Sequence, residues 1–249
     1  MISRRGVLAG AGLVALGAVG ASVPVLRLHA TPRRLPHLTQ AHLAALLAQD
    51  IASPRVLFVG NSMVVRNDLP ARVAARAARD GVALLVASAS ANGAHLVESL
   101  RIAALRRVLA KGWDAIVVQD FTATPLRART RWGSRLAIDA IAQLAAPAPL
   151  LMYPPFPGAP GHRVYEDAAA SSRGPRDPDA YAARTMAHYA ATGQRVAPVP
   201  LRWLEARPDW PTLYDADGHH PSAAGSDLIA DVLWADLKEM LSGARPDLN

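Results

Sequence analysis

The feature that most constrains the fold is a short apolar segment that ends at a glycine and a serine. Residues 56–59 read Val-Leu-Phe-Val, and Gly60, Asn61 and Ser62 follow directly. An apolar run of this length without alternation is typical of a strand buried on both faces, as in a parallel sheet covered by helices. Gly60 allows a sharp turn where the strand ends. Because open α/β folds bind ligands at the carboxyl ends of their strands, we expect Ser62 to lie at such a site.

Apolar segments alternate with helical patterns along most of the chain. Strands are predicted over residues 55–59, 82–87, 114–118, 149–153 and 195–199. Helices are predicted over residues 69–79, 95–110, 133–145, 179–192, 201–207 and 221–241. This alternation favours one doubly wound α/β domain with right-handed crossovers. Residues 154–178 are rich in Pro and Gly and without periodicity, and we expect this long loop to shape a binding pocket.

The first 30 residues resemble an export signal. Arg4 and Arg5 precede residues 6–26, which carry no charge and are rich in Ala, Gly, Val and Leu. Paired arginines in this position resemble a twin-arginine signal, which predicts a periplasmic or extracellular protein. An uncleaved segment would instead anchor the protein in a membrane. We expect residues 31–53 to form a linker and a helix at about 39–49, and residues 54–245 to form the α/β domain.

Composition excludes several kinds of site and partner. The 249-residue chain contains no cysteine, which excludes disulfides, thiolate metal sites and cysteine nucleophiles. Its 27 Lys and Arg residues exceed its 20 Asp and Glu residues, giving a net charge of +7. The basic residues are dispersed and aromatic residues are few, so nucleic acid is not an expected partner. A membrane is expected as a partner only through the N-terminal segment.

A partner for Ser62 lies just before the last predicted helix. A serine hydroxyl needs a base before it can act as a nucleophile. Asp217 and His220 are three residues apart in a predicted turn, where the carboxylate can reach one imidazole nitrogen and leave the other facing outward. Pro221 suits the start of a helix and would hold His220 in place. The spacing predicts Ser62 as nucleophile, His220 as base and Asp217 as the residue that orients the base.

The same segment permits other interpretations. His219 is a rival base, although its position predicts an exposed side chain. Asp217 could instead cap the last helix or form an Asx-turn. Asp215 adds a further carboxylate, so the run could mimic a metal cluster. A metal site would need a second ligand-bearing element, so we expect no metal. Three tryptophans are expected to pack in the core or against loops rather than to form a sugar platform: Trp113, Trp203 and Trp210.

An acyl-transfer site also needs donors that stabilise an oxyanion. Three candidates follow the first three predicted strands: the backbone N–H groups of Ser62 and Gly93 and the side-chain amide of Gln119. The carboxyl ends of parallel strands meet at one edge of a sheet, so we expect these donors on one rim. Thr122 is the alternative to Gln119.

These motifs resemble those of the SGNH (GDSL-like) hydrolase superfamily over about residues 54–241. The Gly-Asn-Ser that ends at Ser62 is similar to its first block, usually Gly-Asp-Ser, and Gly93 is similar to the second-block glycine. The Asp-x-x-His that ends at His220 matches its last block. The third block, usually Gly-x-Asn-Asp, is altered to Val-Gln-Asp at 118–120. The resemblance implies a three-layer, flavodoxin-like sheet of about five parallel strands and ester hydrolysis without metal or organic cofactor.

The predicted function is an exported serine esterase or acyl-ester hydrolase. Its expected substrate is a small-molecule or glycan ester, with a carbohydrate or lipid part that the sequence does not identify. The alternative is a non-catalytic or weakly active binding or accessory protein that keeps the fold. The altered third block is the feature that permits this alternative.

Overall fold

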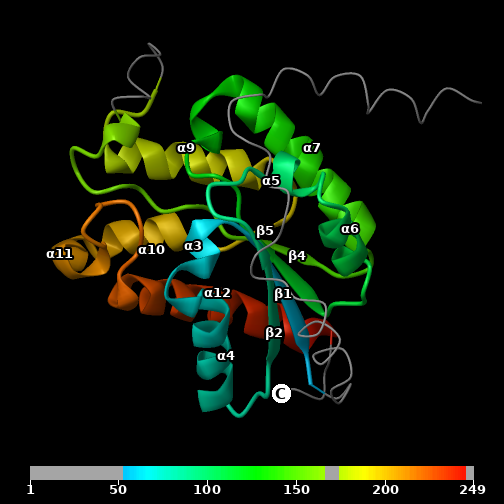
Figure 1. Ribbon diagram of the computed structural model, residues 1–249. Coiled ribbons are helices and arrows are strands. Elements are labelled where there is room, and N and C mark those ends of the chain that lie inside the picture. Colours follow the sequence, from blue (N-terminus) through cyan, green and yellow to red (C-terminus); the bar gives the residue numbers. More distant parts are fainter. Residues whose placement is uncertain (1–52, 166–173, 245–249) are drawn as a thin grey trace, which may run out of the picture. The chain divides into compact units, whose positions relative to one another are not determined.

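The computed structural model describes residues 53–165 and 174–244 (Figure 1). The export signal predicted over residues 1–30 and the helix predicted at about 39–49 lie outside the described residues, as do residues 166–173 of the predicted long loop. Among the helices that the structure describes, none has the length and apolar character needed to cross a membrane.

The centre of the described fold is a sheet of five parallel strands in the order β2-β1-β3-β4-β5. The strands are β1 (Arg55–Gly60), β2 (Leu85–Ser90), β3 (Ala115–Val118), β4 (Leu150–Met152) and β5 (Arg195–Val196). Residues 56–59 are completely buried, because β1 has a strand on each side and helices on both faces. The doubly wound α/β fold with five parallel strands is therefore confirmed.

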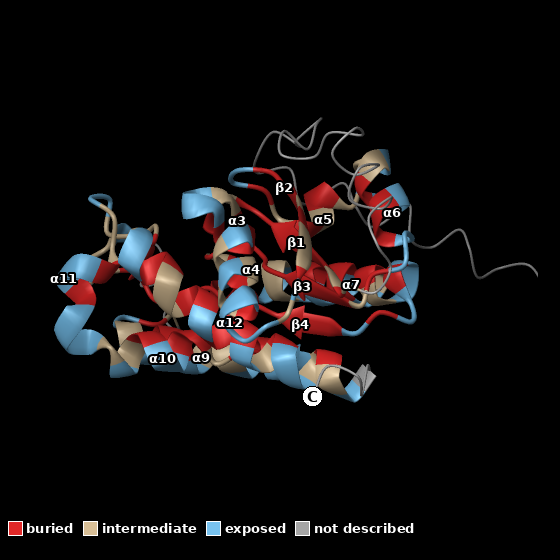
Figure 2. Ribbon diagram, turned by 90° about the horizontal axis from the view of Figure 1, so that it is seen from below, coloured by how far each residue is buried: buried red, intermediate tan, exposed pale blue. Residues whose placement is uncertain are grey.

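Alternate residues of β1 belong to two separate hydrophobic clusters, one on each face of the sheet. Val56 and Phe58 pack on one face, and Leu57 and Val59 pack on the other. The first cluster contains residues of α4 (Leu69–Arg79), α10 (Val199–Glu205), α11 (Trp210–Leu213) and α12 (Ala223–Ala244). The second contains residues of α5 (Leu96–Ser99), α6 (Ala103–Leu109), α7 (Ala128–Ala145) and α9 (Pro178–Ala190). Figure 2 shows buried strands between helices whose outer sides are exposed.

The predicted elements differ from the observed ones mainly at their ends. The strand predicted over 82–87 lies at Leu85–Ser90, because the N–H of Val82 bonds to the carbonyl of Ala77 and closes α4. The helix predicted over 95–110 is two helices, α5 and α6, because Ile102 between them has an extended backbone. The helix predicted from residue 133 begins at Ala128.

The described chain also contains short helices that the sequence pattern did not predict: α3 (Ser62–Val65), α11 (Trp210–Leu213) and the 3₁₀ turns Arg66–Asp68, Thr124–Leu126 and Arg207–Asp209. The expected packing of the three tryptophans is confirmed. Trp113, Trp203 and Trp210 are all buried, and the ring of Trp203 stacks on that of Phe156 at a centroid distance of 3.8 Å. They therefore stabilise the core.

Candidate active site

The turn after β1 is held by hydrogen bonds from neighbouring strands. The N–H of Asn61 donates to Oε1 of Gln119 at 3.0 Å, and Nδ2 of Asn61 donates to the carbonyl of Ala94 at 3.2 Å. Its Oδ1 accepts the N–H of Met63 at 3.2 Å and caps α3, whose first residue is Ser62. Asn61 therefore fixes the position of Ser62, a role that the sequence analysis missed and that its place between Gly60 and Ser62 could have suggested.

Gly60 is required by the close packing of this turn. A Cβ atom at this position would lie 2.6 Å from Cγ2 of Val64 and 2.8 Å from Oε1 of Gln119. Real Cβ atoms do not approach other heavy atoms so closely, so any larger residue would displace the turn or Gln119. The glycine lets the turn pack directly against the end of β3.

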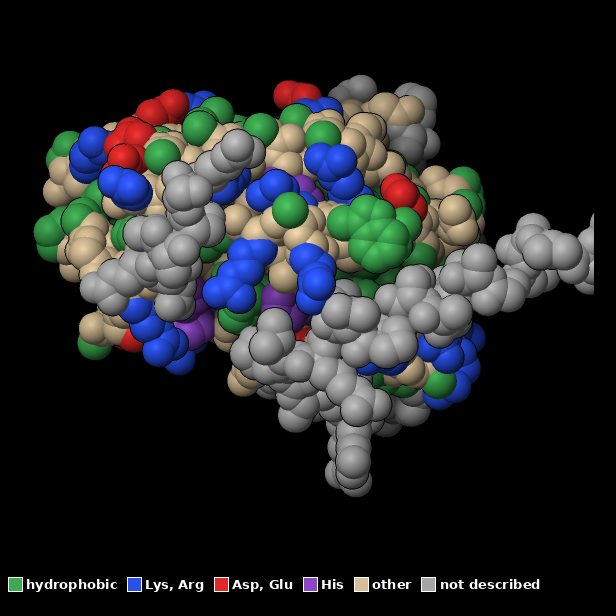
Figure 3. All heavy atoms as spheres, turned by 90° about the horizontal axis from the view of Figure 1, so that it is seen from above, with side chains coloured by type: hydrophobic (Ala, Val, Ile, Leu, Met, Phe, Trp, Pro, Cys, Tyr) green, Lys and Arg blue, Asp and Glu red, His purple; other side chains and the backbone are tan. Residues whose placement is uncertain are grey.

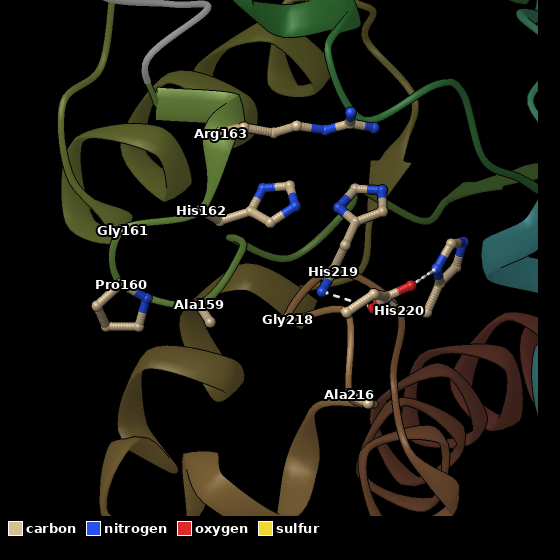
Figure 4. Close-up of a pocket in the computed structure, with 10 residues that line it drawn as sticks. Ala159, Pro160, Gly161, His162, Arg163, Ala216, Gly218, His219 and His220 are labelled. Atoms are coloured by element: carbon tan, nitrogen blue, oxygen red, sulfur yellow. Dashed lines mark hydrogen bonds and ion pairs between the residues drawn. The ribbon is translucent and has the colours of Figure 1, made fainter.

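The structure brings Ser62, His220 and Asp217 into one hydrogen-bonded series. Nε2 of His220 lies 2.9 Å from Oγ of Ser62, and Nδ1 of His220 lies 2.6 Å from Oδ2 of Asp217. Oδ1 of Asp217 accepts the backbone N–H groups of His219 and His220, each at 2.9 Å. Asp217 thus holds both the ring and the backbone of His220 (Figure 4). Asp217 makes these contacts from the loop before α12, and none of them caps that helix.

The environment keeps Asp217 ionised. Burial opposes its charge, but the hydrogen bonds from the His220 ring and from the two backbone N–H groups outweigh burial and hold the pKa of this carboxyl well below its usual range. A charged carboxylate beside Nδ1 favours the tautomer in which Nδ1 carries the proton and Nε2 can accept one. The arrangement can therefore remove a proton from Ser62.

His219 lies away from Ser62. Its ring stacks on that of His162 at a centroid distance of 5.1 Å, and its Nε2 lies 3.5 Å from Oγ1 of Thr122. The expectation of an exposed side chain is wrong: these contacts leave His219 only partly exposed. Burial, together with the nearby His220 and His162, lowers the pKa of His219 to about 4. Of the two adjacent histidines, His220 is the one that contacts the serine.

Two of the three predicted oxyanion donors are backbone N–H groups that are available to a ligand. Within the described part of the chain, the backbone N–H groups of Ser62 and Gly93 have no hydrogen-bond acceptor. Gly93 is exposed, has a φ of +69° and lies in the turn after β2. The hydrogen bond between Asn61 and Ala94 ties this turn to the residue before Ser62. Both N–H groups remain available to a ligand at the rim.

Gln119 lies differently from the prediction. Its side chain is completely buried rather than presented at the rim. Its Oε1 accepts the N–H of Asn61, and its Nε2 donates to the carbonyl of Asp120. Both ends of the amide are thus bonded to backbone, because the longer side chain folds back beside the end of its own strand. In this structure Gln119 supports the turn that carries Ser62. The alternative donor, Thr122, is also buried.

A cavity of about 540 Å³ opens beside His220 (Figure 4). It is lined by residues 159–163 and 216–220. The first segment belongs to the predicted long loop, so the described part of that loop does shape a pocket. The N–H of Ala159 donates to the carbonyl of Gly218 at 2.8 Å and holds the two walls together. The described residues contain no group of three or more His, Asp or Glu side chains placed to hold a metal ion.

Comparisons with known proteins agree with this architecture. No protein-family model and no curated protein matches the chain. A solved structure of a candidate SGNH hydrolase from Slackia heliotrinireducens is similar, with 28% identity and a TM-score of 0.62, over 74% of this chain and 99% of that one. TesA is similar at 22% identity and a TM-score of 0.55, over 75% and 99%.

A catalytic mutant of an acetylxylan esterase from Geobacillus stearothermophilus shares the fold at 15% identity and a TM-score of 0.54, over 74% of this chain and 94% of that one. The similarity to the candidate SGNH hydrolase at 28% identity supports a hydrolytic activity for this chain. The five-stranded fold and the similarity to the candidate SGNH hydrolase at 28% identity support the SGNH (GDSL-like) hydrolase superfamily for this chain, as its motifs predicted.

Proposed function

We propose that the protein is a serine esterase that hydrolyses an acyl ester through Ser62, His220 and Asp217. The observation that carries the proposal is the continuous series from Asp217 through His220 to Ser62, with contacts of 2.6 Å and 2.9 Å. A serine within hydrogen-bond reach of a base, which a third group orients, is the arrangement that activates a hydroxyl.

The reaction follows from these contacts. Oγ of Ser62 attacks the acyl carbon while Nε2 of His220 takes the hydroxyl proton, and Asp217 stabilises the imidazolium that forms. The N–H groups of Ser62 and Gly93 donate hydrogen bonds to the negative oxygen of the tetrahedral intermediate. The bond to the alcohol then breaks, and His220 donates its proton to the leaving oxygen. Water repeats the sequence on the acyl-enzyme, releasing the acid and regenerating Ser62.

We further propose a small-molecule or glycan ester as substrate and a location outside the cytoplasm. The acetylxylan esterase among the similar structures supports an ester of this kind. The basic start of the chain and the uncharged residues 6–26 support export, by cleavage or with an uncleaved anchor. Fusing residues 1–30 to a reporter that is active only after twin-arginine export would test the location, with Arg4→Lys and Arg5→Lys together as the control.

A fluorophosphonate probe tests the catalytic proposal. The probe reacts with an activated serine, and mass spectrometry should find it on Ser62, while the protein should hydrolyse a generic activated ester. The Ser62→Ala variant is the control and should remain unlabelled. Labelling elsewhere, or none at all, would contradict the proposed enzyme and favour the alternative, an accessory protein. The buried Gln119 amide, which leaves two free donors at the rim, is the observation that keeps this alternative in view.

A further inference from the structure

The cavity beside His220 lies on the side of the site where an alcohol would leave. Its lining includes His220 and Asp217, but Ser62 is not among the lining residues. In the proposed reaction the acyl group becomes attached to Ser62, and His220 gives its proton to the leaving oxygen. A cavity next to the histidine and away from the serine therefore suits the alcohol part of an ester. This step rests on the proposed function.

One wall of this cavity is held in place by several contacts. His162 stacks on His219 with an interplanar angle of 9°, and the N–H of Val164 donates to Nδ1 of His162 at 3.2 Å. Gly158 lies so close that a Cβ atom there would be 3.1 Å from the His162 ring. Together with the hydrogen bond from Ala159 to Gly218, these contacts fix the segment that carries Arg163.

Arg163 places a guanidinium group on this wall of the cavity. It is exposed, and no carboxylate among the described residues forms an ion pair with it, whereas Arg66 pairs with Asp215 nearby. Figure 4 shows its side chain extended alongside the rings of His162 and His219. Among the described residues that line the cavity, Asp217 is the only acidic one, and its oxygens already accept hydrogen bonds from His219 and His220.

The cavity is large enough for a small ligand. On the face of the molecule seen from above, Lys and Arg side chains lie beside histidines (Figure 3). The cavity volume of about 540 Å³ is within the range of pockets for small molecules. A guanidinium group binds carboxylates and phosphates through two parallel hydrogen bonds.

We propose that this cavity binds the alcohol part of the substrate and that Arg163 binds an anionic group, a carboxylate or a phosphate, on that alcohol. The substrate would then be an acyl ester of an anionic alcohol. His162 and His219 would form the flat side of the pocket against which the alcohol lies. Arg163 would act in specificity, while the bond-breaking steps stay with Ser62 and His220.

Two acetate esters of nearly the same shape test the proposal with the full chain. One is the acetate of para-hydroxybenzoate, which carries a carboxylate on the alcohol part, and the other is the acetate of para-hydroxybenzamide, which is neutral. The ratio of their kcat/KM values should fall roughly fivefold in Arg163→Gln, mainly through a higher KM for the charged ester, because one partly exposed ion pair is lost. Arg163→Lys should keep part of the preference, and added salt should weaken it.

The matched control is Arg79→Gln, which removes an exposed arginine from the far end of α4 and should leave the ratio unchanged. Equal ratios in the wild type and in Arg163→Gln would overturn the proposed anion site while leaving the esterase proposal intact, because the neutral ester reports on catalysis alone. Failure of the wild type to hydrolyse either ester would overturn the esterase proposal, and the anion site with it.

Discussion

Nε2 of His220 lies 2.9 Å from Oγ of Ser62, although 158 residues separate them in the chain. The contact does not depend on these two side chains alone. Nδ2 of Asn67, five residues after Ser62, donates to the carbonyl of Pro221 and to Oγ of Ser226, each at 2.9 Å. Arg66 forms an ion pair with Asp215 in the same loop. The segment after β1 and the loop before α12 are therefore held together by contacts outside the proposed catalytic series.

Because these contacts do not involve Ser62, the Ser62→Ala variant tests the catalytic role of this residue separately from its effect on folding. The rate of ester hydrolysis should fall by several orders of magnitude in this variant, because the residues of such a series act together and none of the others can replace the nucleophile. Its thermal unfolding midpoint should stay close to that of the wild type, since the contacts of Asn67 and Arg66 remain. Turnover near the wild-type value, measured on an activated ester, would disprove the proposed nucleophile.

The two adjacent histidines form a matched pair of substitutions. His220→Ala should lower kcat by several orders of magnitude, because it removes the group in contact with Ser62. His219→Ala should lower kcat much less, because that ring contacts His162 and Thr122 instead. Steady-state kinetics of both variants on one ester decide the assignment. A larger loss in His219→Ala than in His220→Ala would reverse it.

Gln119→Ala distinguishes support of the turn from donation to an oxyanion. The variant leaves the buried N–H of Asn61 without its acceptor, which typically costs about 1–3 kcal/mol of stability. We therefore expect both the free energy of unfolding and kcat to fall, because Asn61 positions Ser62. Urea unfolding and kinetics on the same preparation provide the measurement. A fall in kcat with unchanged stability would instead indicate a direct donor to the oxyanion.

The strands and the pairing of Asp217 with His220 could be predicted because both are local in sequence. Apolar runs bounded by turns identify the strands, and a spacing of three residues brings the carboxylate to the ring. The direction of the Gln119 side chain could not be predicted, because it depends on an N–H group 58 residues away in the chain. The contact between the two walls of the cavity could not be predicted either. It joins Ala159, in a segment without periodicity, to Gly218, which is distant in the chain.

The buried His188 should make the protein less stable in acid. Burial, with the positive charges of Arg135 and Arg131 nearby, lowers its pKa to about 4. A histidine in the unfolded chain titrates near pH 6.5, so between about pH 6.5 and about pH 4 the unfolded state binds a proton that the folded state does not. The free energy of unfolding should fall as the pH decreases through this window, by up to about 1.4 kcal/mol per pH unit for this residue.

Urea unfolding of the wild type and of His188→Gln at about pH 7 and about pH 5 measures this effect. The variant has no titrating group at this position, so its stability should depend less on pH in this range. It keeps a polar side chain near Oγ of Ser134, which lies 3.4 Å from Nε2 of His188. The same pH dependence in both proteins would show that His188 does not contribute.

The two glycines of α12 should respond in opposite directions to the same substitution. A Cβ atom on Gly225 would overlap the carbonyl oxygen of Leu213 and lie 2.7 Å from Cη2 of the completely buried Trp203, so Gly225→Ala should destabilise the protein by about 1–3 kcal/mol. A Cβ atom on Gly243, near the end of the same helix, meets nothing within 4 Å, and Gly243→Ala should stabilise by up to about 1 kcal/mol. Thermal unfolding of both variants measures the difference.

Because α12 begins just after His220, Gly225→Ala should also lower esterase activity, whereas Gly243→Ala should not. Equal unfolding midpoints in the two variants would show that α12 does not pack against Leu213 and Trp203 as described.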